Sequence, residues 1–321
     1  KYNSLGFRSE EVDPKKNHIL VLGDSVAWGH GLGNEDTISH LLNKRLPNHQ
    51  VLNLAVNGYG IDQYYLFLKR NIELLNPKLV IVVIYAGNDI QNTGSNISYG
   101  KSKPLFKLID GTLNLVHKPG NRFSCINIFS GSWLLNRPYI SSLKEKTCEI
   151  NSLKLNNLKK VISVLLRNIK ELAERHNAKT LFTLSPSLYD LKVGLCEAQK
   201  MTQYCQHFMK LHLHQHKKIY LSTYNYNAEY YPIDTDLIRD DHVMIIKRLH
   251  RLRWGPLAIF QSIFESENIK YLNYYKELLF SGRSIYDIIR LYRDTHHYSE
   301  LGNQVLSDVI FKVIEKNKIL N

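Results

Sequence analysis

The sequence has few cysteines and no long hydrophobic run. The first absence argues against Cys-x-x-Cys metal and redox sites, and the second against a membrane-spanning helix. Only four of the 321 residues are cysteine, and none stands in the close Cys-x-x-Cys spacing that zinc and redox sites use. The longest apolar run, residues 79–85, is far shorter than the roughly 20 residues that a membrane-spanning helix needs. We therefore expect no membrane-spanning segment in this chain.

The sequence does not decide whether the four cysteines form disulfides. Two disulfides could form in an oxidising compartment, and four buried free thiols are an equal alternative. Cys196 and Cys205 form the better matched pair because the loop between them is short, and the other two are Cys125 and Cys148.

Acidic residues are the minority among the charged ones, with 29 Asp and Glu against 42 Lys and Arg. The resulting net charge of +13 favours anionic partners such as nucleic acid, acidic polysaccharide, cell wall or lipid headgroups. The chain has no zinc-finger spacing, no aromatic RNA-binding signature and no basic helix long enough to grip a duplex. We therefore do not expect it to bind nucleic acid.

One group of histidines has a spacing that could suit a metal ion. Alternate histidines place imidazoles on one face of a strand, but no acidic or cysteine partner lies at ligand spacing nearby. We interpret this group as a solvated basic face and expect no metal and no cofactor. The group consists of His207, His212, His214 and His216.

The sequence does contain an alternation of strand and helix patterns. Short runs rich in branched residues predict buried strands, at about residues 18–22, 51–55, 79–85, 180–184 and 269–272. Apolar residues at helical spacing predict helices, at about residues 38–46, 62–75, 155–172, 257–264, 284–291 and 301–314, with Asp62 as the cap of the second. This order predicts a doubly wound, flavodoxin-like parallel α/β sheet with helices on both faces.

Two stretches without a sustained period interrupt this pattern, at about residues 93–149 and 187–253. We expect one domain, residues 1–321, in which these stretches are irregular insertions and the first covers the sheet edge. Residues 1–17 are polar and contain Asp13-Pro14, which predicts a lead-in segment on the surface.

Polar or glycine-containing turns follow the first three predicted strands, and one of them presents Ser25. The carboxyl ends of parallel strands share the sheet edge where ligands bind. A serine there is either a helix cap or a nucleophile that needs a base and an orienting group. Asp294 and His297 can form such a pair, although Asp294 could equally cap a helix beside a surface histidine.

Four separated blocks resemble, in order, those of the SGNH hydrolases, also called the GDSL lipases and esterases. They are Gly23-Asp24-Ser25, Asn53 to Gly58, Gly87-Asn88-Asp89, and Asp294-x-x-His297 followed by Gly302. They span nearly the whole chain, and Val26 replaces the leucine of the family's name. The stretch from Asn3 to Arg8 resembles the start of a bacterial, often envelope-associated branch. That branch implies a periplasmic, secreted or envelope-associated protein, with a cytoplasmic one as the alternative.

The resemblance implies a role for each matching residue. Ser25 would be the nucleophile, His297 the general base and then the general acid, and Asp294 the group that orients His297. The backbone amides of Ser25 and Gly58 and the side-chain amide of Asn88 would form the oxyanion hole. Family spacing selects His297 over the adjacent His296. Trp28 would either line the substrate pocket or pack in the core.

The activity that this resemblance implies is that of a serine esterase. Its substrate would be an O-acyl ester, O-acetyl above all, on a carbohydrate or cell-envelope molecule, and the basic charge agrees with an anionic one. The alternatives are a lipid esterase or lysophospholipase, a thioesterase, and a sugar O-acyltransferase. A glycan-binding module that has lost turnover is the non-enzymatic alternative, which the intact set of motif residues argues against. The sequence does not predict the oligomeric state.

Overall fold

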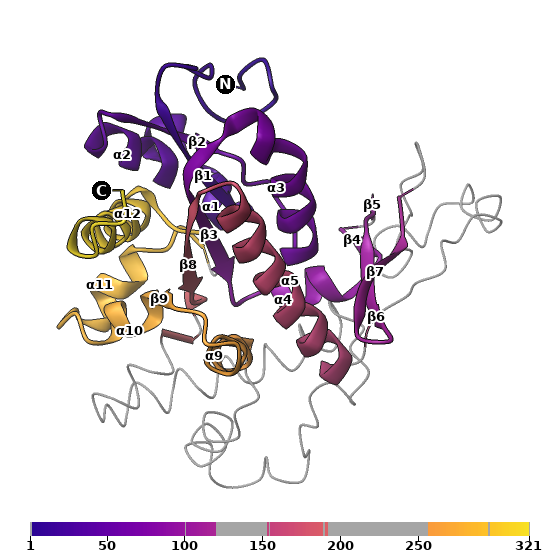
Figure 1. Cartoon of the computed structure of the whole chain (residues 1–321). Coiled ribbons are helices and arrows are strands. Elements are labelled where there is room, and N and C mark those ends of the chain that lie inside the picture. Colours follow the sequence, from indigo (N-terminus) through magenta and orange to yellow (C-terminus); the bar gives the residue numbers. More distant parts are fainter. Residues whose placement is uncertain are drawn as a thin grey trace, which may run out of the picture. The chain divides into compact units, whose positions relative to one another are not determined.

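The computed structural model describes residues 2–99, 101–119, 153, 155–188, 190–191, 256–294 and 296–320 (Figure 1). Internal contacts divide the chain into two compact units. The first comprises Lys1–Thr93, Ile162–Gln199 and Pro256–Asn321, and the second comprises Gly94–Val161 and Lys200–Gly255. The prediction of one domain with two insertions stays a prediction. All four cysteines and the group from His207 to His216 lie outside the described residues.

The first unit is built on a five-stranded sheet in the order β2-β1-β3-β8-β9. All four pairings are parallel, and this order is the one that flavodoxin-like folds show. The prediction of a doubly wound α/β sheet is therefore confirmed. The strands are β1 (Asn17–Gly23), β2 (His49–Asn53), β3 (Pro77–Tyr85), β8 (Lys179–Ser185) and β9 (Tyr271–Asn273).

The central strand β3 shows why the sheet forms from this sequence. Every residue from Leu79 to Tyr85 is buried, as expected for a strand that helices cover on both faces. In Figure 1, α2 (Ile38–Arg45) and α12 (Glu300–Lys316) flank one face. The other face is flanked by α3 (Ile61–Leu75) and α5 (Leu155–Arg175).

The start of α3 differs from the prediction that Asp62 caps it. Gly60 is the N-cap, and Asp62 lies in the first turn with its side chain buried. The hydroxyl of Thr93 accepts the backbone N–H of Ile61 at 3.0 Å, and the side chain of Gln63 accepts that of Gly60 at 3.4 Å. Because these two side chains satisfy the helix end, Asp62 is not needed as a cap.

Several shorter helices complete the described part of the first unit. The predicted helices near residues 257–264 and 284–291 correspond to α9 and α11, whereas α10 was not predicted. Their bounds are α1 (Ser25–Trp28), η1 (Asn34–Asp36), α4 (Asp89–Gly94), α9 (Pro256–Ser266), α10 (Tyr274–Leu279) and α11 (Ile285–Arg290). No described helix is long and apolar enough to cross a membrane.

The second unit contains two short antiparallel hairpins that the sequence analysis did not anticipate. Strand β4 (Ile97–Ser98) pairs with β5 (Lys101–Ser102), and β6 (Leu105–Ile109) pairs with β7 (Thr112–His117). Asp110 and Gly111 turn the second hairpin with φ angles of 49° and 75°. An Asp-Gly pair with two positive φ angles is a common hairpin turn, so the local signal was present.

The lead-in segment is more buried than predicted. Asn3, Phe7 and Arg8 are buried, so the prediction that residues 1–17 lie on the surface is wrong at these positions. The Asn3 side chain accepts the backbone N–H groups of Leu5 at 3.1 Å and Phe7 at 2.9 Å. This turn directs the Phe7 ring onto Phe67, at 6.0 Å between centroids, and brings Arg8 against the loop that follows α1.

Candidate active site

A sharp turn between β1 and α1 places Ser25 at the carboxyl edge of the sheet. A Cβ on Gly23 would lie 2.5 Å from the Cβ of Ala27 and 2.9 Å from the carbonyl oxygen of Val83, so only glycine fits this turn. Asp24 then caps α1 by accepting the backbone N–H of Val26 at 2.9 Å. Ser25 is thus the first residue of its helix, and its side chain is nearly buried.

The structure brings Ser25, His297 and Asp294 together over a separation of more than 260 residues along the chain. Nε2 of His297 lies 3.0 Å from Oγ of Ser25, and Nδ1 of His297 lies 2.8 Å from Oδ2 of Asp294. Both distances are those of hydrogen bonds. Oγ of Ser25 lies farther, 3.4 Å, from Oδ2 of Asp24, so the contact with His297 is the closer one.

Asp294 is held in the ionised form that such an arrangement uses. Partial burial alone would raise its pKa, but the hydrogen bonds from the His297 side chain and from the backbone N–H groups of His296 and His297 outweigh burial and lower it. The two backbone bonds are 2.7 Å and 2.8 Å long. They occupy Oδ1 and leave Oδ2 for the imidazole of His297, which fixes the tautomer that presents an acceptor to Ser25.

The neighbouring His296 points to a different partner. Its Nδ1 lies 3.1 Å from the hydroxyl of Tyr85, the last residue of β3. Burial lowers the pKa of His296 below its ordinary value. The structure therefore places His297, rather than His296, against Ser25, and the role of His297 as the base stays a prediction.

Contacts with the end of β8 anchor the loop that carries His297. The hydroxyl of Tyr298 lies 2.6 Å from Oγ of Ser185, and the hydroxyl of Tyr292 donates to the carbonyl of Pro186 at 2.8 Å. A Cβ on Gly302 would lie 2.0 Å from the carbonyl oxygen of Leu291. Glycine is therefore required where α12 passes this loop, which accounts for the glycine five positions after His297.

Gly58 and Asn88 follow the two strands that neighbour β1. Gly58 has a φ of 74°, a left-handed conformation that glycine adopts without strain. Asn88 follows β3, and its side chain forms a hydrogen bond with the carboxylate of Asp24. Because β1 lies between β2 and β3, the loops that carry these residues flank Ser25, where donors to an oxyanion are expected.

Two fully buried carboxylates, Asp24 and Asp89, lie beneath this edge. Asp89 accepts the hydroxyl of Tyr64 and the backbone N–H of Tyr85, both at 2.9 Å. Burial, followed by repulsion from Asp24, raises the pKa of Asp89 well above its ordinary value. Burial raises the pKa of Asp24 to about 6, although the Val26 backbone N–H, His297 and Asn88 oppose this.

The raised pKa of Asp24 predicts a specific pH dependence of stability. The unfolded chain releases this proton near pH 3.8 and the folded chain near pH 6, so ionisation of Asp24 weakens the fold as pH rises through this window. The shift corresponds to about 3 kcal/mol. Urea unfolding at pH 4 to 7 should therefore show Asp24→Asn gaining stability relative to the wild type as pH rises. A stability difference that stays constant across this range would contradict this account.

Trp28 is half-buried at the end of α1. The Arg8 guanidinium lies 4.2 Å from its ring centroid and donates to the backbone carbonyls of Trp28 and Gly29 at 2.8 Å and 2.7 Å. Trp28 thus packs against the N-terminal segment, and its contact with substrate stays a prediction.

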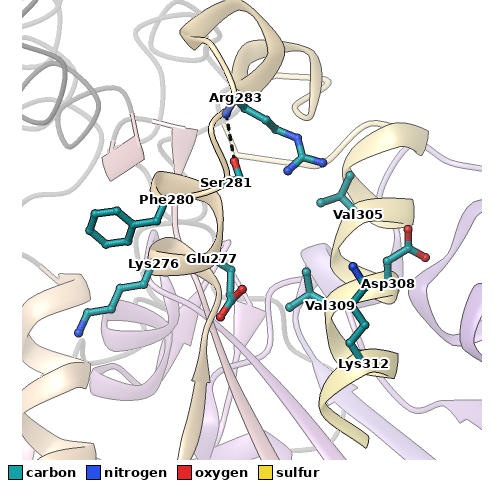
Figure 2. Close-up of a pocket in the computed structure, with 9 residues that line it drawn as sticks. All are labelled: Lys276, Glu277, Phe280, Ser281, Arg283, Val305, Asp308, Val309 and Lys312. Carbon is teal, nitrogen blue, oxygen red and sulfur yellow. Dashed lines mark hydrogen bonds between the residues drawn. The ribbon is translucent and has the colours of Figure 1, made fainter. Parts of the chain in front are cut away.

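A pocket elsewhere in the first unit has no comparable chemistry. It occupies about 390 Å³, and Figure 2 shows residues of α12, such as Val305 and Lys312, facing Glu277 of α10 and Arg283 across it. Its lining contains no histidine or cysteine, and its one serine hydroxyl, that of Ser281, accepts the backbone N–H of Arg283. Within the described parts of the chain, no group of three or more His, Cys, Asp and Glu residues could hold a metal ion.

Sequence reasoning missed four residues that hold the candidate site together. Arg8 contacts the loop after α1, and His30 contacts the ring of His297. Tyr85 and Tyr298 anchor the loop that carries His297. Tyr298 directly follows His297 and Tyr85 ends the third strand, so their positions alone could have singled them out. Nothing in the local sequence indicates the roles of Arg8 and His30, because their partners lie in other elements.

Comparison with known proteins finds no matching family model and no matching curated protein, but several solved structures. One is a psychrotrophic esterase from Pseudoalteromonas, with 13% identity, 94% of this chain and 98% of that chain covered, and a TM-score of 0.43. Another is a lipase/acylhydrolase from Enterococcus faecalis, with 11% identity, 94% and 96% covered, and a TM-score of 0.42. A GDSL-like lipase from Bacteroides thetaiotaomicron matches at 11% identity, with 95% and 91% covered and a TM-score of 0.43.

Three features of the chain itself bear on its chemistry. Its strand order is flavodoxin-like, its four motif blocks follow the family's order, and Ser25, His297 and Asp294 form a continuous hydrogen-bonded chain. These are the features on which the resemblance of the sequence to the SGNH hydrolases rests.

Proposed function

We propose that the protein is a serine esterase that removes short O-acyl groups, acetyl above all, from a carbohydrate or cell-envelope substrate. The proposal of serine-esterase catalysis rests on two contacts of His297. Its Nε2 lies 3.0 Å from Oγ of Ser25, and its Nδ1 lies 2.8 Å from Oδ2 of Asp294. A serine hydroxyl becomes a useful nucleophile when a base accepts its proton and an anion stabilises the protonated base.

The first half of the reaction forms an acyl-enzyme. Oγ of Ser25 attacks the ester carbonyl carbon while its proton passes to Nε2 of His297, and the carboxylate of Asp294 stabilises the imidazolium. The backbone N–H groups of Ser25 and Gly58 and the amide of Asn88 donate to the oxyanion. The tetrahedral intermediate then expels the alcohol, which takes the proton from His297.

The second half regenerates the enzyme. A water molecule gives a proton to Nε2 of His297 as its oxygen attacks the acyl carbon on Ser25. Collapse of the second tetrahedral intermediate releases the carboxylic acid and returns the proton to Oγ of Ser25. If a sugar hydroxyl replaces this water, the same acyl-enzyme yields an acyltransferase, so the acceptor decides between the two activities.

The charge around the candidate site supports an anionic substrate. Arg293, next to Asp294 in the chain, is exposed, and the whole chain carries a net charge of +13 with its histidines counted as neutral. Cationic side chains attract anionic substrates and raise their local concentration. An acidic polysaccharide or another anionic envelope molecule fits this surface, and a periplasmic or secreted location forms part of the proposal.

A panel of p-nitrophenyl esters from acetyl to palmitoyl tests the proposed acyl length. We expect the acetyl ester to give the highest kcat/KM and activity to fall as the acyl chain lengthens. Preference for long chains would favour a lysophospholipase or thioesterase instead, and acyl transfer to an added sugar would indicate an acyltransferase. If wild type and Ser25→Ala were equally inactive on every ester and both bound glycan, the enzymatic proposal would fail.

Asn88→Ala tests the oxyanion donor. Removing one such donor lowers kcat by about 10²- to 10³-fold in comparable acyl-transfer enzymes, and we expect a loss in this range with a smaller change in KM. Steady-state kinetics on the preferred ester measure it. Asn317→Ala, which alters an exposed amide at the end of α12, serves as the control and should keep wild-type rates. Unchanged kcat in Asn88→Ala would remove Asn88 from the proposed oxyanion hole.

A further inference from the structure

A second histidine lies against the ring of the proposed general base. The rings of His30 and His297 have centroids 4.5 Å apart and an interplanar angle of 32°. Aromatic rings at this separation attract one another. His30 is exposed, and its ring lies against that of His297.

The backbone of His30 is tied to the nucleophile. Its N–H donates to the carbonyl oxygen of Ser25 at 3.0 Å, which holds the backbone of His30 next to that of Ser25. Gly29 and Gly31 flank it with φ angles of 81° and 76°, in the left-handed region that favours glycine. The chain therefore makes a tight turn that projects His30 beside Ser25.

Two arginines donate to backbone carbonyls of this turn. Arg8 donates to the carbonyl oxygens of Trp28 and Gly29 and is itself buried. Arg293, one residue before Asp294, donates to the carbonyl oxygen of Gly31. The turn that carries His30 is thus joined both to the N-terminal segment and to the loop that carries the proposed base.

The geometry of an imidazole explains why a second contact with the ring of His297 is useful. The imidazole turns about its Cβ–Cγ bond, and this rotation carries Nε2 out of line with Oγ of Ser25. The hydrogen bond from Nδ1 to Asp294 opposes the rotation. However, 48% of the Asp294 side-chain surface is exposed, where water competes for its hydrogen bonds.

We propose that His30 is a positioning residue for His297, resting on the proposed function: its ring stacks on the base and holds the imidazole plane in line with Oγ of Ser25. His30 takes no proton in this account. Its contribution appears in kcat, because the alignment matters in the proton transfer and not in the binding of the ester.

The test compares variants that remove or keep the stacked ring. We expect His30→Ala to lower kcat by roughly 10- to 100-fold while KM changes by less than about 3-fold, and His30→Phe to recover most of that loss. Labelling of Ser25 by a p-nitrophenyl phosphonate should slow in parallel, since it needs the same proton transfer but no natural substrate. His176→Ala is the control, because this histidine lies between α5 and β8, at the opposite edge of the sheet, and it should behave as wild type. His30→Asn provides a second truncation if His30→Ala unfolds.

The outcomes separate this inference from the proposed function. If Ser25→Ala is inactive while His30→Ala keeps wild-type kcat, the role of His30 is overturned and the esterase stands. A change confined to KM, or an equal loss in His30→Ala and His30→Phe, also overturns it. If the wild type neither hydrolyses esters nor reacts with the phosphonate, the proposed function fails and this inference fails with it.

Discussion

Replacing Ser25 with alanine should lower kcat for ester hydrolysis by on the order of 10⁶-fold, the loss found when a triad serine is removed from a serine hydrolase. The substitution removes the only atom that can carry the acyl group in the proposed mechanism, while the oxyanion donors stay in place. Residual activity above the uncatalysed rate should therefore persist at a very low level. Steady-state and single-turnover assays with the preferred ester measure the loss.

Ser266→Ala is the matched control for this experiment. Its hydroxyl donates to the carbonyl oxygen of Ile263 within α9, a helix that carries no triad residue, so kcat should stay at the wild-type value. The free energy of unfolding of Ser25→Ala should also stay close to that of the wild type, because Asp24 still caps α1 through its contact with Val26. An active Ser25→Ala would show that another residue carries the acyl group.

The adjacent histidines predict the second large effect. His297→Ala should lower kcat by on the order of 10⁴- to 10⁶-fold, because it removes the base from Ser25 and leaves Asp294 without its imidazole partner. His296→Ala should keep kcat within roughly 10-fold of the wild type, since it loses a contact with Tyr85 but leaves the proton path intact. The two variants differ by one position on one loop, so each is the control for the other.

The kinetics of these variants on a single ester decide between the two histidines. Loss of activity in His296→Ala with activity retained in His297→Ala would show that the contacts in the structure do not describe the working enzyme. Equal, complete losses would mean that the loop as a whole, anchored through Tyr298, collapses when either ring is removed. Thermal unfolding of both variants distinguishes that collapse from a chemical effect.

The sheet could be predicted from the sequence because its strands are unusually apolar. The run from Leu79 to Ile84 is buried on both faces, and a continuous run of branched residues has few other stable environments. Strand order then brings Ser25 and Asn88 to one edge, whereas the roles of these residues were expected only from the resemblance of four sequence blocks to a known family. The boundaries of α5 were predictable for a similar reason, namely its long amphipathic stripe.

The parts that escaped prediction depend on partners that are distant in the sequence. Arg8 is buried because it donates to backbone carbonyls 20 and 21 residues away, and a polar N-terminal stretch gives no sign of this. His30 is significant only because the loop of His297 folds beside it. The hairpins between residues 97 and 117 are the exception, because their partners are local. The Asp110-Gly111 turn gave a signal, but strands of two to six residues show too little periodicity to be recognised.

Covalent labelling of Ser25 tests the central claim most directly. A p-nitrophenyl phosphonate should release one nitrophenolate per chain, and peptide mass spectrometry should locate the adduct on Ser25. The account predicts that Ser25→Ala takes up no label and that His297→Ala is labelled far more slowly than the wild type. Label on a different residue, or equal labelling of wild type and Ser25→Ala, would contradict the assignment of Ser25 as the nucleophile.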